Sequence, residues 1–145
     1  TEINIARKIQ QSLIPCTTFE NSWCRVAGMT ASATEVGGDY FDIVALSDHR
    51  LVVAVADVAG HGVGSGILSA MTKSALRSQH MHVASPAMVL ENLNRTIYQV
   101  SERNMFVTLA YLLLDADART AAYATAGHLP LLFRTDDVTV VSVKL

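Results

Sequence analysis

The run LVVAVA at residues 51–56 is the feature that most constrains the fold, because it is apolar at every position. Side chains of a strand alternate between its two faces, so a strand made of this run has to be covered on both. We therefore expect a central, doubly covered strand. The preceding run FDIVAL at 41–46 and the polar segment 47–50 complete the pattern of a hairpin.

Helical periodicity predicts three helices outside this hairpin. Ile5, Ile9 and Leu13 recur every four residues, which indicates an amphipathic helix that ends before Pro15. A second helix is expected after Gly66. Its core-facing residues are Ile67, Leu68, Met71 and Ala75.

The third helix begins at Ser85 and Pro86, which are typical of an N-cap and a first helical position. Its apolar positions are Val89, Leu90, Leu93, Ile97 and Val100. The remaining segments read as strands at 105–115, 120–128, 130–134 and 138–143, with turns at 115–119 and 136–137. Strands, two helices and strands again predict an α+β fold with largely antiparallel sheets.

Composition excludes several classes of protein. The 145 residues are 50% hydrophobic and 17% charged, which fits one compact domain with a substantial core. The net charge is -2 with scattered basic residues, so we expect no nucleic-acid partner. No apolar run reaches the roughly 18 residues of a membrane span, and the N-terminus lacks a secretory signal, so we expect a cytoplasmic protein. Cys16 and Cys24 lack metal-site spacing and are expected to be ordinary thiols.

Two aspartates lie beside glycines at the ends of expected strands. Asp39 follows two glycines, whereas Asp57 ends the apolar strand and precedes the glycine-rich segment 60–66. Glycine lets a backbone approach a ligand closely, and carboxylates with carbonyl oxygens suit a hard divalent cation. Both aspartates are equally typical of turns, so the residue pattern alone leaves this alternative open.

The glycine-rich segment does not predict nucleotide binding. It lacks the Gly-Lys-Ser/Thr ending of a P-loop and the acidic partner of a dinucleotide fold. The GGDYF sequence at 37–41 resembles the GGDEF motif of diguanylate cyclases, but it lies too early in the chain and carries tyrosine at the fourth position.

Four motifs in register resemble a known family. EVGGDYFD, VADVAGHGVGSGILSAM, MFVTLAYLLLD and YATAGHLPLLF are similar to the SpoIIE/RsbU branch of the bacterial PPM metal-dependent serine/threonine phosphatases. The opening IQQSLIP resembles the helix that precedes this domain. The resemblance implies two largely antiparallel sheets forming a sandwich flanked by helices, with a linker or regulatory helix at 1–15 and a phosphatase domain at 16–145.

The resemblance also implies a function. The family binds two Mn²⁺ or Mg²⁺ ions, and Asp39 matches the first acidic ligand, Asp57 the bridging ligand and Val58 the residue that offers its carbonyl. A metal-activated water would attack a phosphoserine or phosphothreonine, expected on a STAS-type anti-anti-sigma protein. Tyr40 and Phe41 are expected to anchor the strand that carries Asp39.

Further aspartates that the family supplies near its C-terminus are not found before the chain ends, so we expect a C-terminally incomplete domain. The turn residues Asp115, Asp117, Asp136 and Asp137 match no family ligand. A truncated or non-catalytic module that binds a phosphoprotein is therefore the alternative. The opening helix could pair with a copy of itself in a homodimer or with an upstream sensor, or it could simply pack on the domain.

Other polar residues of the motifs have less certain roles. His61 is expected either to protonate the leaving oxygen or to hydrogen-bond its loop, and His128 to organise a loop. Asp42 is expected to support the site or to make a surface or turn contact. Thr108 and Tyr111 are expected to pack within an apolar strand.

Overall fold

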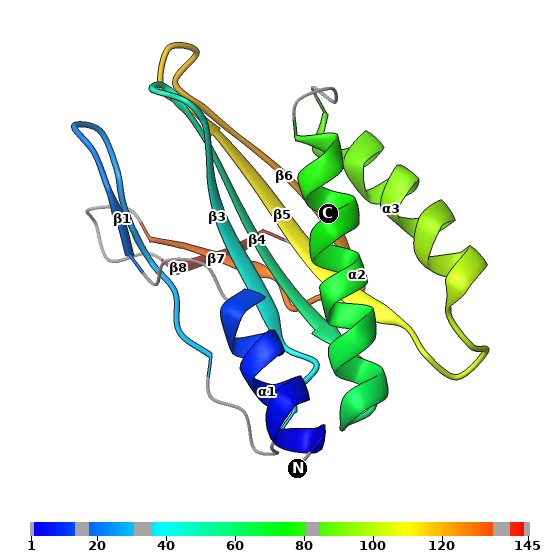
Figure 1. The fold of residues 1–145 in the computed structure, drawn as a ribbon. Coiled ribbons are helices and arrows are strands. Elements are labelled where there is room, and N and C mark those ends of the chain that lie inside the picture. Colours follow the sequence, from blue (N-terminus) through cyan, green and yellow to red (C-terminus); the bar gives the residue numbers. More distant parts are fainter. Residues whose placement is uncertain (1, 14–17, 31–35, 81–84, 135–139, 144–145) are drawn as a thin grey trace.

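The computed structural model describes residues 2–13, 18–30, 36–80, 85–134 and 140–143. A four-stranded antiparallel sheet of order β3-β4-β5-β6 is its centre, and β1-β2 and β7-β8 form two-stranded antiparallel sheets (Figure 1). The elements are α1 (Glu2–Leu13), β1 (Thr18–Glu20), β2 (Arg25–Ala27), β3 (Tyr40–Ser47), β4 (Arg50–Val58), α2 (Val63–Gln79), α3 (Pro86–Val100), β5 (Val107–Asp115), β6 (Thr120–Ala126), β7 (Leu131–Arg134) and β8 (Val140–Val143).

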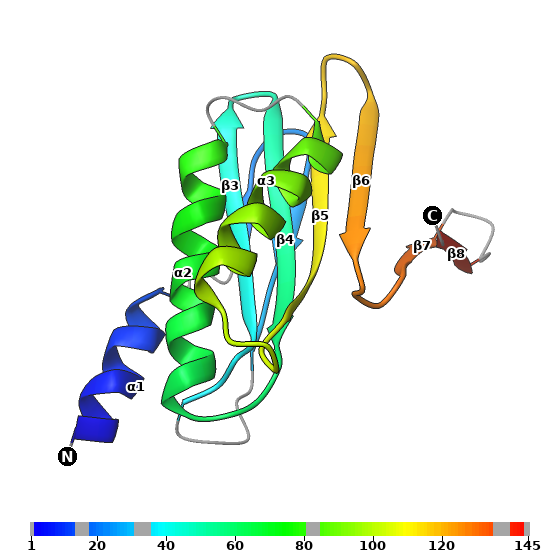
Figure 2. The same ribbon diagram turned by 90° about the vertical axis from the view of Figure 1, so that its right-hand side faces the viewer.

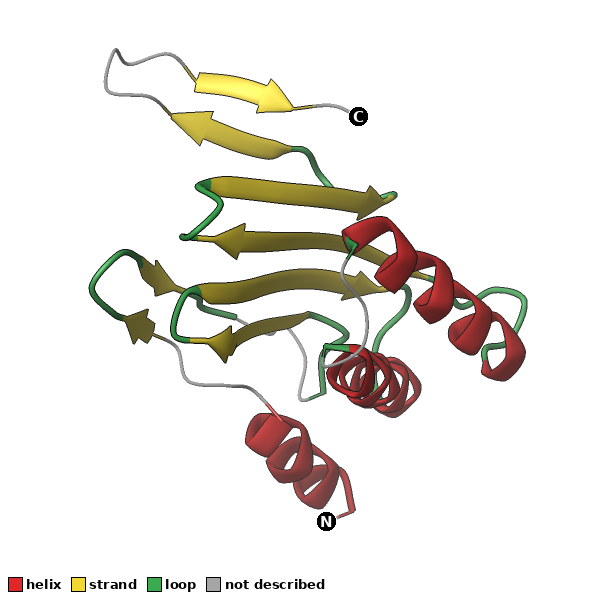
Figure 3. Cartoon of the chain, turned by 90° about the horizontal axis from the view of Figure 1, so that it is seen from above, coloured by secondary structure: helices red, strands yellow, loops and turns green. Residues whose placement is uncertain are grey.

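The predicted α+β class with antiparallel sheets is confirmed. The helices α2 and α3 cover one face of the central sheet, whereas β1 and β2 lie on the opposite side (Figures 1 and 2). The sheet β7-β8 lies beyond β6 and away from the helices (Figure 3). Within the described part of the chain, no helix has the length and apolar character required to cross a bilayer.

The hairpin of β3 and β4 forms as predicted, and β4 is central because it pairs with both β3 and β5. One face of β4 is covered less completely than predicted. Val52, Ala54 and Val58 are buried under the helices, but Val55 on the other face is 42% exposed. The prediction of a doubly covered strand is thus wrong for the described residues, since no full second layer lies on that face.

The helices differ from prediction at particular positions. α2 begins at Val63, ahead of the predicted start, and Ile67 is 56% exposed because it faces α1 rather than the sheet. The buried stripe of α2 contains Leu68, Thr72 and Leu76. α3 begins at Pro86 as predicted, but its last residue, Val100, is 52% exposed and lies outside the core.

The apolar core lies between the central sheet and these two helices. Its aliphatic residues come from both layers and include Val52, Val58, Leu68, Leu76, Val89, Leu93, Leu109 and Leu113. Tyr40 and Phe41 are each 6% exposed, which confirms that both anchor β3. They do so on opposite faces, because Tyr40 belongs to the core under the helices and Phe41 lines the other side.

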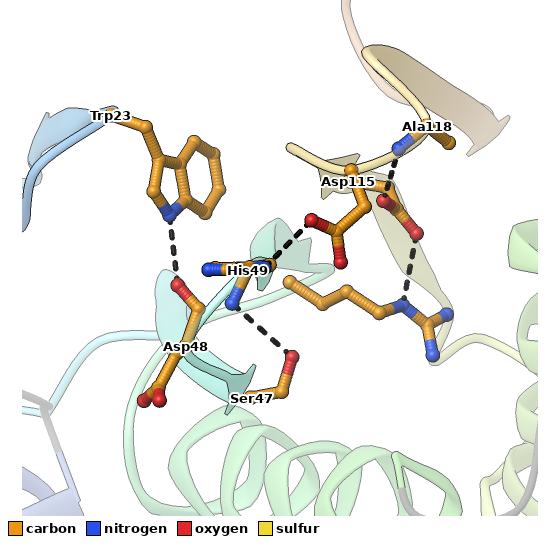
Figure 4. A network of polar contacts seen from close by, with 8 residues as sticks. Trp23, Ser47, Asp48, His49, Asp115 and Ala118 are labelled. Atoms are coloured by element: carbon orange, nitrogen blue, oxygen red, sulfur yellow. Dashed lines mark hydrogen bonds and ion pairs between the residues drawn. The ribbon is translucent and has the colours of Figure 1, made fainter.

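A polar network ties together the turns at one end of the sheet (Figure 4). The indole of Trp23 donates to the Asp48 carbonyl at 2.9 Å, Arg50 pairs with Asp115 at 3.4 Å, and His49 contacts Asp117 at 2.7 Å. Asp115 and Asp117 are thus engaged at this end, whereas Asp136 and Asp137 lie outside the described residues.

Candidate functional site

Asp39 and Asp57 meet at the end of the sheet opposite to the turn network. Asp39 directly precedes β3, and Asp57 is the penultimate residue of β4. The register pairs Tyr40 with Ala56, so the same register sets Asp39 across from Asp57. Both side chains line one cavity of about 300 Å³ on the sheet face away from α2 and α3. The structure therefore brings together the two carboxylates that the sequence singled out.

The carboxylate of Asp57 affects the pKa of Asp39. The pKa of Asp39 is raised, first by partial burial and then by the neighbouring carboxylate of Asp57 and a side-chain hydrogen bond with it. His128 partly opposes this rise. Two carboxylates this close repel each other when both are ionised, and a cation between them would relieve the repulsion.

The carbonyl of Val58 lies against the backbone beside Asp39. A Cβ atom built on Gly38 would be only 2.6 Å from the Val58 carbonyl oxygen. Only a residue without a Cβ permits this approach. The predicted ligand carbonyl therefore lies next to the chain segment that carries the first predicted carboxylate.

The loop between β4 and α2 borders the same end of the sheet. Gly60 and Gly62 have φ values of 93° and 82°, a left-handed conformation that glycine adopts without strain. The Gly62 N–H donates to the Val36 carbonyl at 3.3 Å, and the Ala59 N–H donates to the Phe106 carbonyl at 2.8 Å. His61 is exposed on this loop.

Gln10 connects α1 to the segment before Asp39. Its side-chain amide donates to the carbonyl of Gly37, and its amide oxygen accepts from the Gly37 N–H at 3.0 Å. Ile5 and Ile9 are 60% and 57% exposed. Ile9 nevertheless lines a cavity together with Val63 and Ile67 of α2, so this part of the apolar stripe faces α2.

Thr108 and His128 form a pair beside Asp57. Thr108 lies opposite Asp57 in the β4–β5 register, and its Oγ1 is 2.9 Å from His128 Nδ1 and 3.4 Å from the Asp57 carbonyl oxygen. His128 lines the cavity together with Asp39 and Asp57. The prediction that Thr108 only packs is thus wrong. A polar residue at the end of an apolar strand was the available signal.

Asp42 lies on the other face of β3 from Asp39. It is fully buried, accepts from the Tyr40 hydroxyl at 2.7 Å, and accepts from Arg77 of α2 at 2.6 and 2.7 Å. Burial opposes ionisation, but the hydrogen bonds from Arg77 and Tyr40 outweigh it and lower the pKa of Asp42. The predicted surface or turn contact of Asp42 is therefore wrong, whereas support of the site stays a prediction, because Tyr40 follows Asp39 and lines the same cavity.

Tyr111 is packed as predicted and is 2% exposed. Its hydroxyl also lies 3.1 Å from Nδ1 of His80, a buried histidine at the end of α2 that sequence reasoning did not single out.

The two carboxylates of the cavity and the Val58 carbonyl next to Gly38 suit a hard cation. Two carboxylates and one carbonyl are all oxygen ligands, which Mg²⁺ and Mn²⁺ prefer. The described residues contain no cluster of three or more histidine, cysteine, aspartate or glutamate side chains that could enclose a metal by themselves. These oxygen ligands therefore fit an open metal site, in which water or further oxygen ligands would complete the coordination.

Comparison with known proteins finds a matching family model and similar relatives. Residues 47–145 match the family model of Stage II sporulation protein E (SpoIIE), a range that contains Asp57 and His128 but not Asp39. Phosphoserine phosphatase RsbU of Bacillus subtilis is 32% identical over 130 residues, which cover 90% of this chain and 38% of RsbU. Phosphoserine phosphatase RsbP of the same organism is 26% identical over 142 residues, which cover 95% of this chain and 35% of RsbP. The chain thus spans less than two-fifths of the length of either relative.

Solved structures show the same fold. The RsbU and RsbW domains of Rv1364c from Mycobacterium tuberculosis match with a TM-score of 0.67 and 37% identity, over 79% of this chain and 32% of that one. The SiaA-PP2C domain of Pseudomonas aeruginosa matches with a TM-score of 0.71 and 20% identity, over 86% and 52%. RsbX, solved in complex with magnesium, matches with a TM-score of 0.71 and 19% identity, over 88% and 61%. From the matched motifs, the antiparallel fold and these relatives, we conclude that the chain belongs to the SpoIIE family and is a PPM-type domain of the SpoIIE/RsbU branch.

Proposed function

We propose that this chain forms part of a metal-dependent phosphatase that hydrolyses phosphoserine or phosphothreonine on a protein. The observation that carries the proposal is the convergence of Asp39 and Asp57 in one cavity, beside the Val58 carbonyl, in a relative of RsbU. Two curated relatives are named phosphoserine phosphatases.

Each of the three groups has a role in the proposed site. Asp39 would hold one of two Mn²⁺ or Mg²⁺ ions, Asp57 would be the bridging ligand, and Val58 would contribute its carbonyl oxygen. When bound, such ions activate water for in-line attack on a phosphate ester, so no protein nucleophile is needed. Gly38 keeps the carbonyl and the Asp39 segment in contact, and the buried ring of Phe41 fixes the start of β3.

The proposed substrate is a cytoplasmic STAS-type anti-anti-sigma protein in a bacterial partner-switching pathway. The support is the similarity to RsbU and to a protein that joins RsbU and RsbW domains in one chain. We further propose that the exposed Ile5 and Ile9 of α1 pair with a second copy or with an upstream sensor, since the described residues leave both side chains open.

A non-catalytic module that binds a phosphoprotein is the second candidate. The observation that favours it is the small number of ligands, because only two acidic side chains line the cavity within the described ranges. Hydrolysis and metal binding therefore have to be measured separately.

The deciding experiment measures Mn²⁺-dependent phosphate release from a phosphoserine peptide and, independently, Mn²⁺ binding by calorimetry. Asp57→Asn should abolish tight Mn²⁺ binding and reduce kcat/KM by more than about 100-fold, beyond the range typical of groups that only orient a ligand. Asp117→Asn, at the far end of the sheet, is the matched control and should leave both unchanged. Mn²⁺ binding without turnover in the unmutated protein would favour the binding module, and turnover that survives Asp57→Asn would refute the proposed site.

A further inference from the structure

His128 occupies a position in the cavity that the proposed metal ligands do not explain. Asp39 comes from the start of β3, Asp57 from the end of β4, and His128 from the segment after β6, and all three line the same cavity. The backbone directs the histidine there. Gly127 has a φ of 65° and forms a bridge with Leu109, which turns the chain back over the start of β5.

The contact with Thr108 occupies one ring nitrogen of His128. Oγ1 of Thr108 lies 2.9 Å from His128 Nδ1, a contact in which either partner can donate, and the hydroxyl is 3.4 Å from the Asp57 carbonyl oxygen, to which it can donate. When Thr108 donates to Nδ1, the proton of a neutral imidazole resides on Nε2. A protonated ring also carries a proton there. In these two states Nε2 is a hydrogen-bond donor, whereas it is an acceptor when Nδ1 carries the only proton, and the hydrogen bond that the structure describes for the ring involves Nδ1.

A hydrogen-bond donor in this cavity suits a phosphate group that is bound to divalent cations. Two aspartates alone would repel phosphate, but bound divalent cations reverse the sign of the local charge. A donor at the rim of the cavity then meets phosphate oxygens, which are strong acceptors. His128 is placed for this role because its ring lines the same cavity as both carboxylates.

We propose that His128 binds the phosphate group of the substrate through Nε2, and that Thr108 orients the ring by its contact with Nδ1. This inference rests on the proposed phosphatase function. It assigns His128 to substrate binding, whereas the sequence alone suggested the organisation of a loop.

Phosphate binding and loop organisation, the two roles considered for His128, predict different effects for its substitution by asparagine and by glutamine. The side-chain nitrogen of asparagine falls near Nδ1 of histidine, so His128→Asn keeps a partner for Thr108 but cannot reach the phosphate. The side-chain nitrogen of glutamine falls near Nε2, so His128→Gln restores the donor that we assign. His128→Ala removes both, and His49→Ala at the far end of the sheet is the matched control.

The experiment measures binding of inorganic phosphate to the Mn²⁺-loaded, full-length natural protein by calorimetry, and KM and kcat for p-nitrophenyl phosphate. For His128→Ala and His128→Asn we expect the phosphate Kd and the KM to rise roughly 10- to 100-fold, as expected for a hydrogen bond to a charged group. The kcat should change only a few-fold, because the contact is made in both the bound and the transition state. His128→Gln should recover most of the affinity, and Thr108→Val should weaken binding only several-fold.

Several results would overturn the inference. One is normal phosphate affinity in His128→Ala, and another is normal affinity in His128→Asn with weak binding in His128→Gln, which is the pattern of a loop organiser. If the unmutated protein binds phosphate in a His128-dependent way but hydrolyses nothing, the phosphatase proposal fails and this one stands. If the protein hydrolyses the substrate normally whatever residue replaces His128, the phosphatase proposal stands and the proposed role of His128 in phosphate binding fails. Absence of phosphate binding in the unmutated protein overturns the inference as well.

Discussion

Gly38 shows how one missing methyl group sets the geometry of the site. The Val58 carbonyl oxygen, which would meet a Cβ at 2.6 Å, belongs to the backbone of a buried strand and cannot rotate away as a flexible side chain would. The requirement for glycine here therefore comes from close packing. Gly60 and Gly62 differ in this respect, because their positive φ values demand glycine while the space around them is open.

Gly38→Ala is expected to separate the Asp39 segment from the Val58 carbonyl and to weaken Mn²⁺ binding by more than about tenfold, as loss of ligand orientation does. Gly64→Ala is the matched control, because an added Cβ there has only Met105 Cε at 3.9 Å and lies in a helix, where alanine is favoured by about 0.5–1 kcal/mol. Calorimetric titration with Mn²⁺ checks the first effect and thermal melting the second. Equal Mn²⁺ affinity in both variants would contradict the assigned role of Gly38.

At the scale of elements, a buried ion pair joins α2 to β3. Asp42 is fully buried and Arg77 reaches it from the last turn of α2, with the Tyr40 hydroxyl as a further partner. A buried carboxylate that loses its partner is strongly destabilising, although the pair itself contributes little net stability compared with apolar packing. The pair therefore fixes the position of the helix along the strand more than it adds stability.

Arg77→Met should lower the free energy of unfolding by about 3 kcal/mol, at the low end for a broken buried pair, because the Arg77 side chain is 44% exposed and water can partly replace it. The exposed Arg103→Met is the control and should change stability by less than about 0.5 kcal/mol. Urea denaturation measures both. In the double variant with Asp42→Asn, part of the loss should be recovered, and strictly additive losses would mean that the two side chains are not coupled.

At the scale of the whole molecule, the sequence predicted local structure well and contacts between distant segments poorly. The hairpin, the proline at the start of α3 and the position of Asp39 and Asp57 at strand ends follow from periodicity and turn residues. The contact of Thr108 with His128 and that of Asp42 with Arg77 depend on strand register and on which face of a helix meets the sheet, and single-sequence patterns do not specify either. For the same reason Ile67 was assigned to the core although it faces α1.

The buried His80 predicts how the stability of the whole domain depends on pH. Burial lowers the pKa of His80; the charge of Asp42 partly opposes this decrease, and the charge of Arg77 adds to it. Nδ1 of His80 contacts the Tyr111 hydroxyl, and Nε2 has no hydrogen-bond partner among the described residues. The unfolded chain therefore binds a proton more readily than the folded one, so stability is complete above about pH 6.5 and falls as the pH drops below it.

Between pH 6.5 and 5.5 we expect stability to fall because of this residue, by less than the roughly 1.4 kcal/mol per pH unit that one group can contribute. His80→Asn keeps a partner for Tyr111 but cannot titrate, so its unfolding free energy should change less over this interval. His49→Asn, an exposed histidine, should keep the slope of the unmutated protein. Chemical denaturation at several pH values decides, and equal slopes for His80→Asn and the unmutated protein would refute the role of His80.

From the hairpin that carries the two aspartates, we expect a definite order in which the site assembles during folding. Asp39 and Asp57 lie on the two arms of one β3–β4 hairpin, so they come together as soon as a short, local loop closes. Thr108 joins only when β5 pairs with β4 across the intervening helices, and His128 only after β6 is in place. The cation-binding half of the proposed site thus belongs to the low-contact-order part of the fold, and its phosphate-binding half depends on the slower, long-range pairing.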